Sequence, residues 1–207
     1  MTPDISTMAT RLRQAAGERQ RFIVALAGPP GAGKSFLSTA LCQALNEQEM
    51  GIAEIVPMDG YHFDNAVIEP QGLLPVKGAP ETFDVDGLLR DLARLRAADR
   101  NVAVPIFDRP LDLARAGGRI IQTSHRIVLV EGNYLLLDKP PWTGLAPLFD
   151  MTIFIDVPED VIEERLIQRW LDMGQDREGA EERARFKDMI NMQLVNAHSV
   201  APDMIWR

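Results

Sequence analysis

The sequence predicts a three-layer α/β fold with a five-stranded, mostly parallel sheet, a small β-hairpin and a helical lid. Short apolar runs alternate along the chain with segments whose apolar residues recur at helical spacing, as in strands joined by crossover helices. A glycine-rich loop joins the first apolar run to a long helical segment. Because 207 residues suit one well-buried domain, we expect residues 1–207 to form a single domain with a lid at about 165–185.

The first elements surround this loop. Apolar spacing over residues 5–16 predicts a packing helix that ends at Gly17, and the apolar residues 21–27 predict a buried strand. The loop that follows is Gly28-Pro29-Pro30-Gly31-Ala32-Gly33-Lys34-Ser35, which fits the phosphate-binding pattern G-x-x-x-x-G-K-[ST]. Residues 36–48 then continue as an amphipathic helix, so the pattern stands in a strand–loop–helix context.

This loop has the chemistry that a nucleotide phosphate requires. Its glycines allow backbone N–H groups to close around an anion, and the helix N-terminus adds partial positive charge. Lys34 is expected to reach the β- and γ-phosphates, and the Ser35 hydroxyl is expected to bind Mg²⁺. We therefore predict a nucleotide site that comprises Gly28 to Ser35 together with Phe36.

The next strand, predicted over residues 53–58, leads into Asp59-Gly60-Tyr61-His62. Ligands of open α/β sheets sit outside the carboxyl ends of the strands, which makes Asp59 a candidate site residue. Its carboxylate could accept the proton of a substrate hydroxyl or orient Mg²⁺, and the alternative is a turn cap with Gly60. His62 is either a ligand of the substrate or a packed side chain.

The middle of the chain is less regular. Residues 64–82 carry several prolines and glycines with little periodicity, which indicates a functional cover or a disordered loop. Asp84 is expected to cap the next helix. Residues 101–107 predict a third strand, and residues 111–123, divided by Gly117-Gly118, predict a small hairpin over one end of the sheet.

The later strands complete the predicted sheet. Residues 127–130 form an apolar central strand followed directly by Glu131, residues 151–157 form a fifth strand, and residues 202–206 form a short edge strand. An acidic residue at this point is typical of a second metal-ordering position in phosphate-loop enzymes. The alternative for Glu131 is again a turn cap.

A helix, a tip at residues 174–177 and a return helix follow Pro158 and predict the lid. Arg165 and Arg169 are four residues apart and therefore share a helix face near the tip. They could close over a nucleotide, or they could form surface ion pairs with Glu163, Glu164 or Asp172. The return helix is expected to show an apolar face of Phe186, Met189, Ile190 and Leu194.

Composition excludes several partners. The formal net charge is −8, from 30 acidic and 22 basic residues, which argues against nucleic acid or an anionic membrane as the partner. The single cysteine, Cys42, excludes an intrachain disulfide and a thiolate zinc cluster. No apolar run reaches the length of a membrane span and no signal-like region is present, so we expect a cytoplasmic protein. A homodimer is left open.

Several motifs together resemble one group of enzymes. Besides the loop and the segment at Asp59, they are Lys77-Gly78-Ala79-Pro80-Glu81-Thr82-Phe83-Asp84, Phe107-Asp108-Arg109, Glu131-Gly132-Asn133-Tyr134, residues 165–169 and residues 188–191. They resemble the phosphate-loop kinases that include uridine kinase, phosphoribulokinase and bacterial pantothenate kinase. Within this group the chain is similar to small bacterial proteins labelled nucleoside/nucleotide kinase or fructose-transport-system kinase.

This resemblance implies a P-loop NTPase fold and a kinase that uses ATP and Mg²⁺ to phosphorylate a hydroxyl of a small molecule. Asp59 matches the base, Lys34 and Arg169 are further catalytic residues, Arg165 and Arg169 are the lid cations, and Ser35 and Glu131 lie near the metal. The implied acceptor residues are Asp59, His62, Lys77, Asp108, Arg109, Glu131, Asn133 and Tyr134.

Hydrogen-bonding side chains in that set favour a sugar or sugar-like acceptor. Val76 stands where pantothenate kinases tend to carry arginine, and Asp59-Gly60-Tyr61-His62 differs from the Asp-Ser-Phe-Tyr of uridine kinases, which weighs against those acceptors. The alternatives are a nucleoside or pantothenate-type kinase, or a regulatory nucleotide switch with a protein partner.

Overall fold

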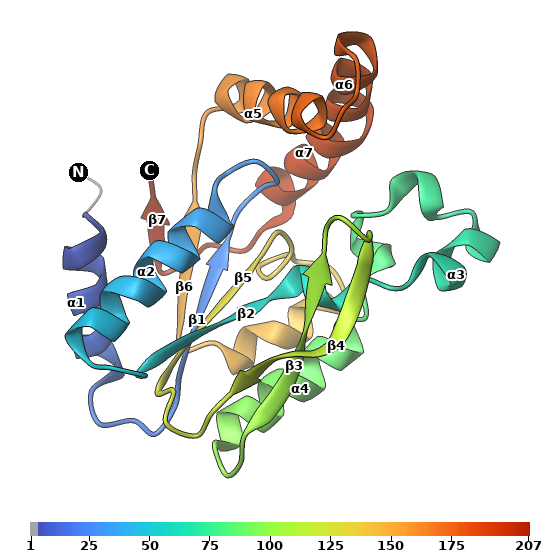
Figure 1. Ribbon diagram of the computed structural model, residues 1–207. Helices are drawn as coiled ribbons and strands as arrows, with labels where there is room; N and C mark the ends of the chain where they lie inside the picture. The colour runs from blue at the N-terminus through green and yellow to red at the C-terminus, as the bar shows by residue number, and fades with distance from the viewer. Residues whose placement is uncertain (1–3) are drawn as a thin grey trace.

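The computed structural model describes residues 4–207, which form a five-stranded parallel sheet with helices on both faces (Figure 1). The strand order is β2-β5-β1-β6-β7, and every neighbouring pair is parallel. The prediction of a three-layer α/β fold with a five-stranded parallel sheet is confirmed. The strands are β1 (Phe22–Ala27), β2 (Ala53–Pro57), β5 (Ile127–Gly132), β6 (Met151–Ile155) and β7 (Met204–Trp206).

Strand alternation divides the core into two layers. Alternate residues of a strand point to opposite faces, and β1 is buried along its whole length. Phe22, Val24 and Leu26 pack with helices α1 (Ile5–Ala16) and α2 (Lys34–Gln48). The intervening residues of β1 pack on the other face with α4 (Val85–Ala97), the short helical segment η5 (Trp142–Leu148) and α7 (Met189–His198). Both layers leave the carboxyl ends of the strands uncovered by core helices (Figure 1).

The hairpin differs from its prediction. The predicted third strand is β3 (Val102–Asp108), which pairs antiparallel with β4 (Leu113–Ile121) in a separate two-stranded sheet. The pairing register shifts between Val104 and Ile106, opposite Gly117-Gly118, because Pro105 has no N–H for the ladder. The two glycines therefore form an irregularity within β4 and not the turn between two strands. The fifth place in the main sheet is taken by β7.

The segment predicted as an irregular cover is a series of short helical turns after η1 (Met58–Tyr61). They are α3 (Asn65–Ile68), η2 (Glu69–Gln71), η3 (Leu74–Val76) and η4 (Pro80–Thr82). Ile68 and Thr82 are fully buried, and the Gly78 N–H donates to the Thr82 hydroxyl at 2.9 Å. The turns therefore pack as a defined wall beside the sheet. Asp84 caps α4 as expected, accepting from the Gly87 N–H at 2.8 Å.

The predicted lid region is a helical hairpin above the carboxyl ends of the strands (Figure 1). It consists of α5 (Glu159–Asp172), α6 (Arg177–Arg183), the π-helical segment η6 (Ala184–Asp188) and α7. Met189 is buried as expected, but Phe186 and Ile190 are exposed. The π-helical segment holds one extra residue per turn, which rotates the following side chains away from a simple helical pattern. No helix within residues 4–207 is long and apolar enough to cross a membrane.

Candidate active site

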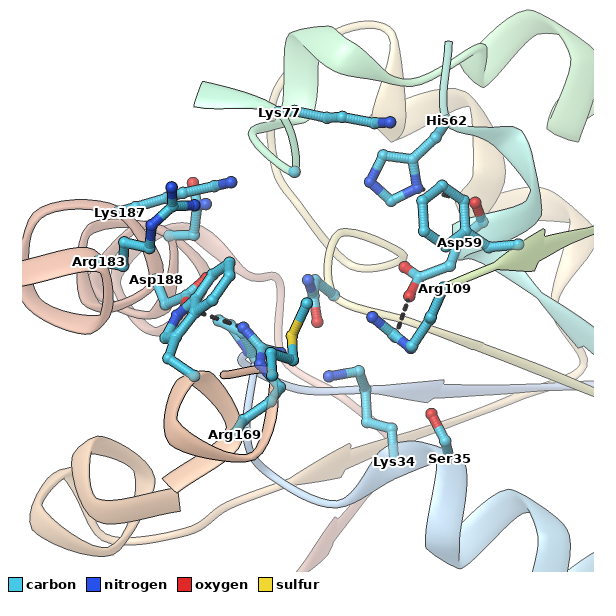
Figure 2. A pocket seen from close by; sticks show the side chains of 18 of the residues that line it. Lys34, Ser35, Asp59, His62, Lys77, Arg109, Arg169, Arg183, Lys187 and Asp188 are labelled. Atoms are coloured by element: carbon cyan, nitrogen blue, oxygen red, sulfur yellow. Dashed lines mark hydrogen bonds and ion pairs between the residues drawn. The ribbon is translucent and has the colours of Figure 1, made fainter. Parts of the chain in front are cut away.

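A cavity of about 560 Å³ lies where β1, β2 and β5 end, between the phosphate-binding loop, the β3–β4 hairpin and the lid (Figure 2). It brings together most of the site residues that the sequence suggests. Those that line it are Pro30, Gly31, Gly33, Lys34, Ser35, Phe36, Asp59, His62, Lys77, Arg109, Glu131, Asn133 and Arg169.

The loop that follows β1 has a backbone that requires glycine. Gly28 has φ 153°, and a β-carbon at this position would lie 2.8 Å from the carbonyl oxygen of Ile155 in β6. Gly33 caps α2 with the left-handed φ of 93°. The loop can therefore turn tightly from the sheet into the helix, with the helix N-terminus facing the cavity.

Lys34 is buried at the floor of this loop. Its Nζ donates to the carbonyl oxygen of Pro29 at 2.8 Å. Burial lowers the pKa of Lys34 to about 8, although the carboxylates of Glu131 and Asp59 act in the opposite direction. An anion at the loop would replace the lost hydration of this ammonium group, so the site suits a phosphate.

The metal site suggested by the sequence centres on Ser35 and Glu131. The Ser35 hydroxyl donates to Oε2 of Glu131 at 3.2 Å. Burial, together with the nearby carboxylate of Asp59, raises the pKa of Glu131. Hydroxyl and carboxylate oxygens are ligands that Mg²⁺ accepts, and within residues 4–207 no group of three His, Cys, Asp or Glu residues surrounds a metal position. The donor set therefore fits Mg²⁺ that takes its other ligands from phosphates and water.

Asp59 faces the cavity from η1, directly after β2. Its Oδ2 accepts from Nη2 of Arg109, at the turn of the β3–β4 hairpin, at 2.7 Å. The backbone of this turn packs closely against the hairpin. A β-carbon at Gly60 would lie only 2.4 Å from the carbonyl oxygen of Pro105. The side chain of Asp59 bonds to Arg109 and not to the backbone of its own turn, so it is not the turn cap that was the alternative.

His62 is packed and also lines the cavity. Its ring lies between Phe83 and Phe107, with centroid distances of 4.0 and 4.7 Å, and Nδ1 bonds to the carbonyl oxygen of Asp59 at 2.8 Å. Burial lowers the pKa of His62, which favours the neutral imidazole. The packing of His62 is therefore observed, and its role as a ligand of the substrate stays a prediction.

Lys77 lines the cavity but is held by the protein. Its Nζ donates to Oδ1 of Asn65 at 2.7 Å and to the carbonyl oxygen of Asp112 at 2.6 Å, and it forms an ion pair with the Asp112 carboxylate at 3.0 Å. This lysine ties the wall of helical turns to the hairpin. Its charge is already balanced.

Two of the suggested acceptor residues lie outside the cavity lining. Asp108 forms an ion pair with Arg115 at 3.2 Å along the hairpin and does not line the cavity. Tyr134 is fully buried, and its hydroxyl donates to the carbonyl oxygen of Gly78 at 2.6 Å. Asp108 therefore stabilises the hairpin, and Tyr134 supports the segment of Lys77 and Gly78.

The lid arginines have different partners from those weighed in the sequence. Arg169 donates to Oδ2 of Asp188 at 2.8 Å, and the indole N–H of Trp170 donates to the same oxygen at 2.7 Å. Arg165 does not line the cavity; it donates to the carbonyl oxygen of Gly31 at 3.3 Å and so ties the lid to the loop.

Sequence reasoning assigned no role to several residues of the cavity. Gly78, Phe83, Phe107, Asp188 and Asn191 belong to motifs that carry the resemblance, but the sequence assigns no role to these residues individually. The signal that could have found two of them is the four-residue spacing of Arg183 and Lys187, which places both on one side of the return helix. The residues concerned are Leu74, Gly78, Phe83, Phe107, Asp112, Trp170, Met173, Arg183, Lys187, Asp188 and Asn191.

A parallel sheet that ends in a phosphate-binding loop, with acidic residues at the neighbouring strand ends and a basic lid, defines a phosphate-loop phosphotransferase. Residues 23–204 match the model of the Phosphoribulokinase / Uridine kinase family, and the chain belongs to this family. The chain is therefore a kinase that acts on hydroxyl groups of small molecules. Enzymes of this family use ATP, normally with Mg²⁺.

Similar proteins agree with this assignment. The chain is 35% identical to a Schizosaccharomyces pombe protein named "putative uridine kinase", over 98% of this chain and 91% of that one. It is 36% identical to the Escherichia coli protein YggC, over 93% of this chain and 80% of that one. A crystal structure of a "putative fructose transport system kinase" from Silicibacter sp. TM1040 superposes with a TM-score of 0.93 at 42% identity and covers 99% of this chain and 100% of its own.

Proposed function

We propose that this protein transfers the γ-phosphate of Mg²⁺–ATP to a hydroxyl of a small, sugar-like molecule, with Asp59 as the base. The observation that carries the proposal is the position of the Asp59 carboxylate, which faces the same cavity as Lys34 and the Ser35–Glu131 pair (Figure 2). A base, a phosphate-binding cation and a metal-binding pair therefore share one small volume.

The loop and its neighbours hold the nucleotide. Backbone N–H groups of Gly28 to Ser35 and the ammonium group of Lys34 bind its phosphates, while Ser35 and Glu131 hold the metal ion. Bound Mg²⁺ supplies positive charge to the phosphate oxygens on which negative charge develops. Lys34 requires no large movement, because its side chain already lies at the loop with one carbonyl partner.

Asp59 receives the proton of the acceptor. Arg109 occupies Oδ2, and Oδ1 has no hydrogen-bond partner within residues 4–207, so this oxygen is free to accept from a hydroxyl. The acceptor oxygen forms a bond to the γ-phosphorus, the bond from that phosphorus to the leaving oxygen of ADP breaks, and the hydroxyl proton passes to Asp59. Arg109 fixes the carboxylate for this step.

The acceptor end of the cavity favours a polyhydroxylated molecule. Arg109, His62 and Asn133 present hydrogen-bonding groups there, and the rings of Phe83 and Phe107 form one wall. A site of this kind recognises hydroxyl groups and rejects compounds that lack them.

The decisive variant is Asp59→Asn, which keeps size and shape but cannot take up the proton. We expect near-wild-type binding of Mg²⁺–ATP by calorimetry and a fall of ~10² or more in acceptor phosphorylation. ADP release is measured with a panel of hexoses, pentoses, their phosphate esters and nucleosides. Asp108→Asn is the matched control, because Asp108 pairs with Arg115 outside the cavity.

Three results would contradict the proposal. Collapse of Mg²⁺–ATP binding in Asp59→Asn would place Asp59 in the metal site. Unchanged phosphorylation would place the base elsewhere. ATP turnover that no compound of the panel stimulates would favour a regulatory nucleotide switch over a kinase of sugar-like acceptors.

A further inference from the structure

The lid carries a cluster of positive charge around one indole ring. The centroid of the Trp170 ring lies 5.0 Å from the guanidinium carbon of Arg183, 5.5 Å from that of Arg169 and 5.8 Å from Nζ of Lys187. Asp188 neutralises Arg169. Arg183 and Lys187 also line the cavity, and within residues 4–207 neither forms an ion pair or a hydrogen bond. Both cations lie against the ring face, and the carboxylates of Asp188 and Asp112 act on Lys187 without forming an ion pair with it.

The other cations of the cavity are accounted for. Arg109 pairs with Asp59, and Lys77 pairs with Asp112. Lys34 lies at the phosphate-binding loop. Arg183 and Lys187 are therefore the cavity cations at the lid that form no ion pair within residues 4–207, in a protein whose formal net charge is −8. Lys187 is half-buried, and burial lowers its pKa, so a bound anion would restore the stabilisation that water no longer provides.

Lys187 and Arg183 lie at the acceptor end of the cavity. A β-carbon at Gly78 would lie 4.0 Å from Cε of Lys187, so this side chain reaches the segment of Lys77 and Gly78. Gly78 is fixed there by Tyr134 and Thr82. In Figure 2 both lid cations lie on the side of the pocket opposite His62 and Asp59, and away from Lys34 and Ser35. This placement separates them from the part of the cavity that receives the nucleotide phosphates.

We propose that the acceptor carries a phosphomonoester group, which Arg183 and Lys187 bind while the acceptor hydroxyl faces Asp59. A phosphomonoester is close to a dianion at neutral pH and matches two positive charges, whereas a carboxylate matches one. Guanidinium and ammonium groups form strong, charge-assisted bonds to phosphate oxygens. This inference rests on the proposed function and narrows its substrate class from sugars to phosphorylated sugar-like compounds.

The test uses inorganic phosphate as the probe after Mg²⁺ and a non-hydrolysable ATP analogue have saturated the loop. Calorimetry and thermal shift are measured against sodium chloride of equal ionic strength. We expect phosphate to bind the wild-type complex, and Lys187→Gln or Arg183→Gln to weaken it by at least ~10-fold. Arg183→Lys keeps the charge and should retain most of the binding. Arg177→Gln is the matched control, because Arg177 lies on the same lid, pairs with Glu181 and does not line the cavity.

A second arm compares matched acceptors in the kinase assay, D-fructose with D-fructose 6-phosphate and glycerol with glycerol 3-phosphate. The phosphorylated member should have a KM at least ~10-fold lower, and the two glutamine variants should remove that difference with little change for the neutral member.

Each contrary outcome has a distinct meaning. No phosphate binding to the nucleotide-loaded wild type, or binding that persists in both glutamine variants, would overturn the inference. Equal losses of phosphate and ATP-analogue affinity would assign the two cations to the nucleotide and also overturn it. Acetate that binds as well as phosphate would overturn the phosphomonoester assignment. Failure of the wild type to bind the ATP analogue would instead overturn the proposed function itself.

Discussion

The two walls of the cavity are built in different ways. The wall at the phosphate-binding loop depends on the backbone: β1 is buried and paired on both sides, and the loop turns through positions that only glycine occupies without strain. The lid wall depends on side chains, chiefly the bonds of Arg169 and Trp170 to Asp188 and the ion pair of Arg185 with Glu163. The tip residue Gly174 has no atom within 4 Å of a β-carbon position.

This difference indicates that the two walls have different roles in the reaction. A site made from backbone N–H groups keeps its geometry whichever side chains surround it, which suits a phosphate chain that is the same in every reaction. A wall made from side-chain contacts on a helical hairpin can change its charge and shape by single substitutions. We expect the loop to determine how the nucleotide phosphates are held for transfer. We expect the lid to determine the turnover rate and the choice of acceptor.

The largest effect is expected from Lys34→Ala, at the centre of the backbone-built wall. Within residues 4–207 the Nζ of Lys34 has one hydrogen-bond partner, the carbonyl oxygen of Pro29, so we expect the fold to survive the substitution. Kinase activity should fall by ~10³ or more, because the phosphates lose their buried cation. Circular dichroism checks the fold and ADP release checks the activity. Full activity in a folded variant would contradict the phosphate-transfer proposal.

A pair of glycine substitutions compares the two walls directly. In Gly28→Ala the new β-carbon meets the carbonyl oxygen of Ile155 at 2.8 Å, so the backbone must move. We expect the free energy of unfolding to fall by ~1–3 kcal/mol, and activity to fall by ~10² because the loop is displaced. Gly174→Ala at the lid tip has φ 88° and open space, and should lower the free energy of unfolding by about 1 kcal/mol, with little loss of activity. Urea unfolding and steady-state kinetics measure both, and equal activity losses would remove the proposed distinction.

A smaller loss of activity than in Lys34→Ala or Gly28→Ala is expected from Arg169→Ala on the lid. Removing this cation should lower turnover by on the order of tenfold, while nucleotide binding changes less, because the lid contacts charge that develops during transfer. Arg177→Ala is the control, since Arg177 lies on the same lid, pairs with Glu181 and does not line the cavity. Turnover equal to that of the wild type would make Arg169 a structural partner of Asp188 only.

The features that depend on local order along the chain can be predicted from the sequence. The phosphate-binding loop, the helix after it and the parallel strands follow from glycine positions and apolar periodicity, which act over a few neighbouring residues. The placement of Asp59 and Glu131 near the site can also be predicted from the sequence, because the carboxyl ends of parallel strands meet at one edge of the sheet.

Contacts between side chains far apart in the sequence become known only from the folded structure. Arg109 binds Asp59 at a separation of 50 residues, and Lys77 binds Asp112 at a separation of 35. Asp108 and Tyr134 lie in the motifs that suggest the site, but the folded structure directs their bonds to Arg115 and Gly78, away from the cavity. Side-chain direction depends on strand register and on the π-helical segment of the lid, and neither is encoded in a local pattern. For that physical reason, the gathering of Arg183 and Lys187 on Trp170 is visible only in the folded molecule.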